Sequence, residues 1–283
     1  MNSPPTAERT ARTLANLQRS ILLVGAGKMG GAMLEGWLGL GLDPARIAVI
    51  EPQPSPEITA LTARGLRLNA PANAIGEVAA LVLAIKPQTA PEAMPALAPY
   101  VGASSVVVSI MAGRTLRFLE AALAGAAIVR AMPNTPAAIG RGITVVVPNA
   151  RVAANQRELV DALLSAVSTV EWIDDETLMD AVTAVSGSGP AYVFLLAECM
   201  AQAGIAAGLP AALAGKLARA TVAGSGELLH RSPLDAATLR QNVTSPGGTT
   251  AAALDVLMAK DGLAPLLTNA IAAATDRSRE LAG

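Results

Sequence analysis

Cysteine and aromatic residues are scarce in this chain of 283 residues. Cys199 is its one cysteine, so the chain can form neither an internal disulfide nor a cysteine-based zinc site, and we expect no metal. Aromatic residues make up only 2%, so the core must be built from Ala, Val, Leu, Ile and Met. The one histidine, His230, stands near a predicted helix end and is a poor candidate for a general base. Such a composition suits a reducing cytoplasm.

Excess charge of one sign is also lacking. The chain has 21 basic and 22 acidic residues, a net charge of −1, so we expect neither a nucleic-acid partner nor an anionic membrane. The longest apolar stretch, residues 181–209, is interrupted by Ser, Gly, Pro and Glu198. We interpret it as a buried helix after a tight turn, because a membrane span needs about 20 consecutive apolar residues.

Residues 1–19 are polar and contain no apolar run. They do not resemble a secretory signal, so we expect a cytoplasmic protein. We predict that they form a flexible or loosely helical extension outside the fold.

The rest of the chain divides into two regions. In residues 20–173, short Val- and Ile-rich runs alternate with stretches long enough for crossover helices, such as 29–40 and 152–167. This alternation predicts a Rossmann-type domain with a parallel, doubly wound sheet. Residues 174–283 contain only Ala- and Leu-rich helical stretches, which predict an all-helical domain. The predicted strands are 21–24, 47–50, 81–85, 106–110, 127–131 and 143–147.

A glycine-rich motif lies between the first predicted strand and the first predicted helix. Residues 25–30 read Gly-Ala-Gly-Lys-Met-Gly, which in this context predicts binding of a dinucleotide pyrophosphate at the helix start. A Gly-rich turn of purely structural use is the alternative. Glu51 ends the second strand, where an acid binds the adenosine ribose. It would repel a 2′-phosphate, and residues 52–56 offer no arginine, which favours use of NADH.

Four further motifs lie at strand ends or helix starts. Residues 84–88 and 129–137 follow predicted strands, so they face the edge of the sheet where ligands bind. Residues 186–192 and 242–250 each open a helix with glycines and hydroxyls. Each of these two helix starts could hold a carboxylate, although an ordinary N-cap with a glycine hinge is the alternative.

Together these motifs resemble those of pyrroline-5-carboxylate reductases, and the resemblance covers residues 21–281. It implies a Rossmann domain and a helical domain that pairs with a second subunit, as a homodimer or a ring of dimers. It also implies a cyclic imine substrate: NADPH or NADH would reduce Δ1-pyrroline-5-carboxylate to L-proline, the final step of proline biosynthesis.

The resemblance and the residue types also suggest individual roles. Thr250 is the predicted catalytic residue, because its hydroxyl would orient and polarise the imine. Glu176 would stabilise the cationic ring nitrogen, although an acid at a helix start can serve only the helix dipole. The predicted substrate-binding residues are Glu176, Asn242, Ser245, Gly247, Gly248, Thr249 and Thr250. The predicted cofactor-binding residues are Gly25, Gly27, Lys28, Met29, Gly30, Glu51, Asn73, Ala84, Ile85, Lys86, Pro87, Ile110, Met111, Ala112 and Asn242.

Three other functions stay open. A β-hydroxyacid dehydrogenase would carry a catalytic lysine on the helix at 191–204, where this chain has none. An imine reductase for another ring is harder to separate, because its specificity would lie in the shape of the pocket. A non-catalytic dinucleotide-binding regulator would not need Thr250 at the nicotinamide.

Overall fold

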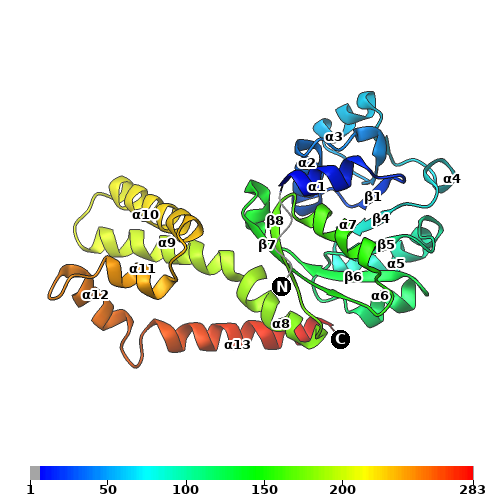
Figure 1. Cartoon of the computed structure of the whole chain (residues 1–283). Coiled ribbons are helices and arrows are strands. Elements are labelled where there is room, and N and C mark those ends of the chain that lie inside the picture. The colour runs from blue at the N-terminus through cyan, green and yellow to red at the C-terminus, as the bar shows by residue number, and fades with distance from the viewer. Residues whose placement is uncertain (1–6, 283) are drawn as a thin grey trace. The chain divides into compact units, whose positions relative to one another are not determined.

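The computed structural model describes residues 7–282. They form two compact units, residues 7–187 together with 275–282 and residues 188–274 (Figure 1). The sequence pattern placed residues 174–187 and 275–282 in the helical domain, whereas the structure groups them with the sheet. A helical pattern in the sequence predicts where a helix forms, but it does not predict which of the two units the helix packs against.

Eight strands form one sheet in the order β3-β2-β1-β4-β5-β6-β7-β8. They are β1 (Ile21–Val24), β2 (Ile47–Ile50), β3 (Arg67–Leu68), β4 (Ala80–Leu83), β5 (Val106–Ser109), β6 (Ala127–Met132), β7 (Gly142–Pro148) and β8 (Ser168–Trp172). The sequence did not predict β3, which has only 2 residues, or β8, which mixes exposed and buried positions. The strand order reverses between β1 and β4, so the ligand crevice is expected at the carboxyl ends of these strands.

The sheet is mostly parallel, as predicted, and β7 is the exception. This strand pairs antiparallel with β6 and parallel with β8. The link from β6 to β7 contains only the short 3-10 helix η5 (Thr135–Ile139), whereas a parallel crossover needs a dozen or more residues. Six strands on one side of this link therefore stay parallel, and the chain turns back at β7.

Helices cover both faces of the sheet. Alternate strand residues such as Ile21 and Leu22 enter two separate hydrophobic cores, one against α2 and α7 and the other against α4, α5 and α6. Trp37 of α2 is fully buried, and its Nε1 donates to the Leu163 carbonyl at 2.8 Å. The helices of this unit are α1 (Ala7–Ala15), α2 (Lys28–Gly39), α3 (Pro56–Ala60), α4 (Ala72–Ile75), α5 (Ala90–Ala93), α6 (Leu116–Ala122), α7 (Ala154–Leu164) and α8 (Met179–Val182).

Helix α1 belongs to the first unit, so the prediction of an extension outside the fold was wrong for these residues. Leu14 is 1% exposed and Thr10 is 2% exposed, and α1 packs on α7. Thr10 and Leu14 are spaced for one helix face, a pattern that the surrounding arginines obscured. Residues 1–6 lie outside the described part of the chain.

The second unit consists of helices. They are α9 (Gly189–Ala206), α10 (Ala211–Arg231), α11 (Ala236–Asn242), α12 (Thr249–Leu257) and the first part of α13 (Leu263–Ala282). The prediction of a buried helix after a tight turn was wrong for α9. No residue of α9 is buried, and a π-helix (Thr183–Gly187) precedes it. The apolar side chains of this helix are exposed to solvent in the single chain, and Phe194, for example, is 68% exposed.

Among the described residues, one helical segment is long and apolar enough to cross a membrane by length and composition. It covers residues 176–206, and a window of 18 residues within it has a mean hydropathy of 1.2. A 3-10 helix, η6 (Glu176–Leu178), and the π-helix break it. Because a partner subunit can also cover an apolar helix, this segment is weak evidence for a membrane protein.

Candidate active site

The glycines of residues 25–30 fold the loop tightly against the end of β4. Gly25 has a φ of +89°, and a Cβ there would lie 2.6 Å from the Ala84 carbonyl oxygen. A Cβ on Gly30 would lie 2.2 Å from the Gly25 oxygen, whereas one on Gly27 would meet no atom within 4 Å. Gly27 precedes α2, whose first turn has no side-chain cap. The loop therefore leaves open space at the start of α2, which suits an anion.

The carboxylate of Glu51 is held beside this loop. Its Oε2 accepts from the Ala26 N–H at 2.8 Å, and its Oε1 accepts from the Gln53 N–H at 3.0 Å. Asn69 fixes the backbone, because its amide donates to the Glu51 carbonyl and accepts from the Glu51 N–H, both at 2.9 Å. Sequence reasoning missed Asn69. Its φ of +49°, which asparagine tolerates better than most residues, gave no signal in the sequence.

A cleft of about 320 Å³ opens next to the loop. Ala26, Gly27 and Lys28 line one end, and Ser55 and Glu57 lie on its wall. Hydrogen bonds from the Ser55 side chain and the local backbone lower the pKa of the Glu57 carboxyl. Glu57 therefore places a negative charge on the wall of this cleft. Asn73, in contrast, is exposed on α4 and does not line this cleft.

An arginine that the sequence did not single out joins two of the predicted cofactor loops. Residues 84–87 follow β4, and residues 110–112 follow the adjacent β5. Arg114 donates from Nε and Nη2 to the Pro87 carbonyl oxygen at 3.0 and 2.7 Å. Its guanidinium lies 4.6 Å from the centre of the Phe118 ring. The two loops are therefore held together, as expected for neighbouring strand ends.

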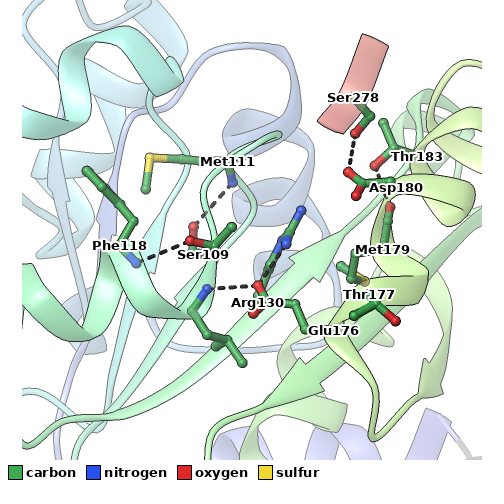
Figure 2. Close-up of polar contacts among 12 residues, drawn as sticks. Ser109, Met111, Phe118, Arg130, Glu176, Thr177, Met179, Asp180, Thr183 and Ser278 are labelled. Carbon is green, nitrogen blue, oxygen red and sulfur yellow. Dashed lines mark hydrogen bonds and ion pairs between the residues drawn. The ribbon is translucent and has the colours of Figure 1, made fainter. Parts of the chain in front are cut away.

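Glu176 has partners within the first unit. Its Oε1 accepts from Arg130 Nη1 at 2.7 Å and from the Leu116 N–H at 2.8 Å. Figure 2 shows the Arg130 and Glu176 side chains pointing toward each other. Asp175 caps η6, because its carboxylate accepts from Thr177 N and Oγ1, and these bonds lower the Asp175 pKa. Glu176 is therefore not needed to cap its own helix.

The other predicted substrate residues lie together in the second unit, between α11 and α12. Asn242 ends α11, and Gly247 has a φ of +69°. A Cβ on Gly248 would lie 2.5 Å from Ser245 Oγ, which can rotate away, so the left-handed backbone of Gly247 is what requires glycine in this loop. No side chain caps the start of α12. Thr249 is exposed there and Thr250 is half-buried.

Comparisons with known proteins decide the family. The description "Pyrroline-5-carboxylate reductase dimerisation" matches residues 176–281, and "NADP oxidoreductase coenzyme F420-dependent" matches residues 20–113. A pyrroline-5-carboxylate reductase of Pseudomonas aeruginosa is 40% identical over 266 residues, which span 93% of this chain and 96% of that protein. The chain belongs to the pyrroline-5-carboxylate reductase family.

Solved structures of pyrroline-5-carboxylate reductases agree with this assignment. The protein from Coxiella burnetii superposes with a TM-score of 0.86 at 32% identity, covering 94% of this chain and 99% of that one. The protein from Plasmodium falciparum, solved with NADP bound, gives a TM-score of 0.78 at 28% identity, covering 95% and 99%. The predicted family and the predicted fold, a Rossmann-type sheet followed by helices, are confirmed.

Proposed function

We propose that this chain reduces Δ1-pyrroline-5-carboxylate to L-proline with NADH or NADPH, the final step of proline biosynthesis. The observation that carries the proposal is the match over 96% of a pyrroline-5-carboxylate reductase at 40% identity. The glycine loop at residues 25–30 lies within the region that matches the NADP oxidoreductase family, and the loop at residues 242–250 lies within the region that matches the dimerisation family.

The residues of the first unit fit a dinucleotide. The open space at Gly27 and the uncapped start of α2 suit a pyrophosphate, as does the adjacent Lys28. Glu51 would accept from the adenosine ribose hydroxyls. The strand-end residues Ala84, Ile85, Lys86, Pro87, Ile110, Met111 and Ala112 would line the nicotinamide half, with Gly25, Met29, Gly30, Asn73 and Asn242 as further cofactor contacts. When bound, the reduced cofactor supplies the hydride.

The loop before α12 would hold the imine. A protonated imine is already electrophilic, so the reaction needs orientation more than a strong acid. The uncapped N–H groups at the start of α12 would bind the substrate carboxylate together with Asn242, Ser245, Gly247, Gly248 and Thr249. The Thr250 hydroxyl would orient the ring nitrogen by a hydrogen bond.

Glu176 is also proposed for the substrate site. The hydrogen bonds from Arg130 and from the Leu116 N–H both go to Oε1, so a contact with the ring nitrogen would be made by Oε2. A nearby carboxylate stabilises the cationic form of the imine.

The helical unit would form a homodimer, with a ring of dimers as a larger alternative. Val193, Phe194 and Leu195 of α9 are 47%, 68% and 57% exposed, and such a large exposed apolar surface marks an interface. Light scattering at micromolar concentration tests this, and a monomer would contradict it. We also propose a cytoplasmic location and no nucleic-acid partner, on the composition and near-neutral charge.

The decisive experiment is oxidation of NADH and NADPH by the purified protein, followed by the absorbance of the reduced cofactor. Pyrroline-5-carboxylate is the test substrate, and open-chain 2-oxo acids and other cyclic imines are the controls. We expect turnover with pyrroline-5-carboxylate and little with the open-chain acids. Preference for another ring, or cofactor binding without any turnover, would contradict the proposal.

A further inference from the structure

Among the residues that the structure describes, Arg130 is the one buried side chain that carries a charge at neutral pH. It lies near the end of β6, and its side chain is only 6% exposed. Its register neighbours are Ser109 of β5 and Val147 of β7. A buried cation is costly unless a partner neutralises it and accepts its hydrogen bonds.

The surroundings of Arg130 make its partner important. The buried side chains of Val145, Val147 and Met179 form a small apolar cluster, and Leu116 and Met132 pack against it. Glu176 is 28% exposed and supplies the carboxylate that pairs with Arg130, with Nη1 and Oε1 2.7 Å apart. The ion pair thus fixes where the Glu176 carboxylate can lie.

The same carboxylate oxygen holds the start of α6. The N–H of Leu116, the first residue of α6, has no acceptor within its own helix and donates to Glu176 Oε1 at 2.8 Å. Leu116 directly follows the loop 110–115. The Ile110 N–H fixes the beginning of this loop on the Leu83 carbonyl at 3.0 Å, and Arg114 fixes it to Pro87.

We propose that Arg130 and Glu176 are positioning residues for the cofactor. Arg130 orients the carboxylate of Glu176, and that carboxylate fixes the end of loop 110–115 through the Leu116 N–H. Residues 110–112 of this loop are then already held in the conformation that binds the cofactor before it arrives. This inference rests on the proposed function, because it requires that loop 110–115 contacts the nicotinamide half.

Two neutral double variants separate this role from charge balance. Arg130→Met with Glu176→Gln keeps an acceptor for the Leu116 N–H, whereas Arg130→Met with Glu176→Met removes it at nearly the same side-chain length. Neither leaves an unpaired buried charge, so both should fold. Any difference between the two reports the hydrogen bond to Leu116. Arg117→Ala, an exposed position on α6, is the control for changes on this helix.

The test is the dissociation constant for NADH and for NADPH, measured by calorimetry without imine, together with the melting temperature. We compare the two double variants with whichever of NADH and NADPH the wild type binds more tightly. The variant with Glu176→Met should bind this cofactor about three- to tenfold more weakly than the variant with Glu176→Gln, which is the effect of one lost hydrogen bond. Arg117→Ala should bind as the wild type does.

Equal dissociation constants in the two double variants would overturn the proposal and leave the ion pair a purely structural role. A wild-type protein that binds neither cofactor would overturn both this inference and the proposed function. A wild-type protein that binds cofactor but leaves pyrroline-5-carboxylate unreduced would overturn only the proposed function, and the comparison of the two double variants would still decide this inference.

Discussion

Alanine substitutions in the glycine loop should separate cofactor binding from folding. At Gly27 the backbone is extended, with φ −67° and ψ −161°, and an added Cβ would meet no protein atom within 4 Å. Alanine is a poorer N-cap than glycine, but it reduces the entropy of the unfolded chain, and each effect is about 0.5–1 kcal/mol. These effects nearly cancel, so we expect Gly27→Ala to melt within about 3 °C of the wild type.

The same methyl group would occupy the space that a pyrophosphate needs for close approach to the backbone. We therefore expect Gly27→Ala to bind NADH and NADPH at least about tenfold more weakly, which corresponds to about 1.4 kcal/mol. This loss should occur without any loss of secondary structure.

Gly30→Ala is the matched comparison, because its methyl group would meet the protein itself. Its Cβ would lie 2.2 Å from the Gly25 carbonyl oxygen, about 1 Å closer than an ordinary C···O contact. Overpacking against backbone costs about 3 kcal/mol, and the better helix propensity of alanine returns about 1 kcal/mol. The net loss of about 2 kcal/mol should lower the melting temperature by roughly 4–8 °C.

Both variants are tested by thermal unfolding and by titration with NADH and NADPH. Gly27→Ala protein that binds cofactor as tightly as the wild type would show that this loop does not hold the pyrophosphate. Gly30→Ala protein as stable as the wild type would refute the steric reasoning.

Three further predictions concern other parts of the molecule. Thr250→Val removes only a hydroxyl, so kcat/KM for the imine should fall about 100-fold while cofactor affinity and melting temperature persist; full activity would leave the backbone N–H groups to carry the mechanism. Glu51→Gln keeps an acceptor for the Ala26 N–H but removes the charge, so kcat/KM should shift toward NADPH by about tenfold or more; an unchanged ratio would show that Glu51 does not decide cofactor choice. Burial raises the pKa of Asp161 above its ordinary value of 3.8, although the Trp172 N–H opposes the shift. A raised pKa stabilises the fold at low pH and loses this contribution as the pH rises through it, so Asp161→Asn should melt higher than the wild type at neutral pH. That advantage should shrink below pH 3.8, and melting curves that stay parallel from acid to neutral pH would contradict it.

The sequence predicted those features that depend on local pattern. The loop 25–30 could be recognised because a strand, three glycines and a helix are contiguous in the chain. The buried strands could be recognised because a strand that is buried on both faces of the sheet appears in the sequence as a continuous run of Val and Ile. The antiparallel direction of β7 was not predicted, because the length of a connection, and not the strand itself, decides whether a pair is parallel.

The contacts around Glu176 could not be predicted in the same way. Arg130 and Leu116 are distant from it in the chain, and they meet only because β6, α6 and η6 come together in the fold. Arg114 is similar, since its acceptor is the carbonyl of Pro87 on another loop. Neither arginine carries a sequence signal that distinguishes it from a solvated side chain.

The position of Trp37 has a practical consequence for measurements of unfolding. Trp37 and Trp172 are the two tryptophans of the chain, and both belong to the first unit, so residues 188–274 hold none. Tryptophan fluorescence, excited selectively so that Tyr192 of α9 does not contribute, therefore reports the unfolding of the first unit and does not report on α9 to α12. Circular dichroism is dominated by the helices of both units. Curves from the two methods that coincide would mean that the two units lose structure in one cooperative transition. If the dichroism signal falls first, the helical unit unfolds while the environment of Trp37 is still intact.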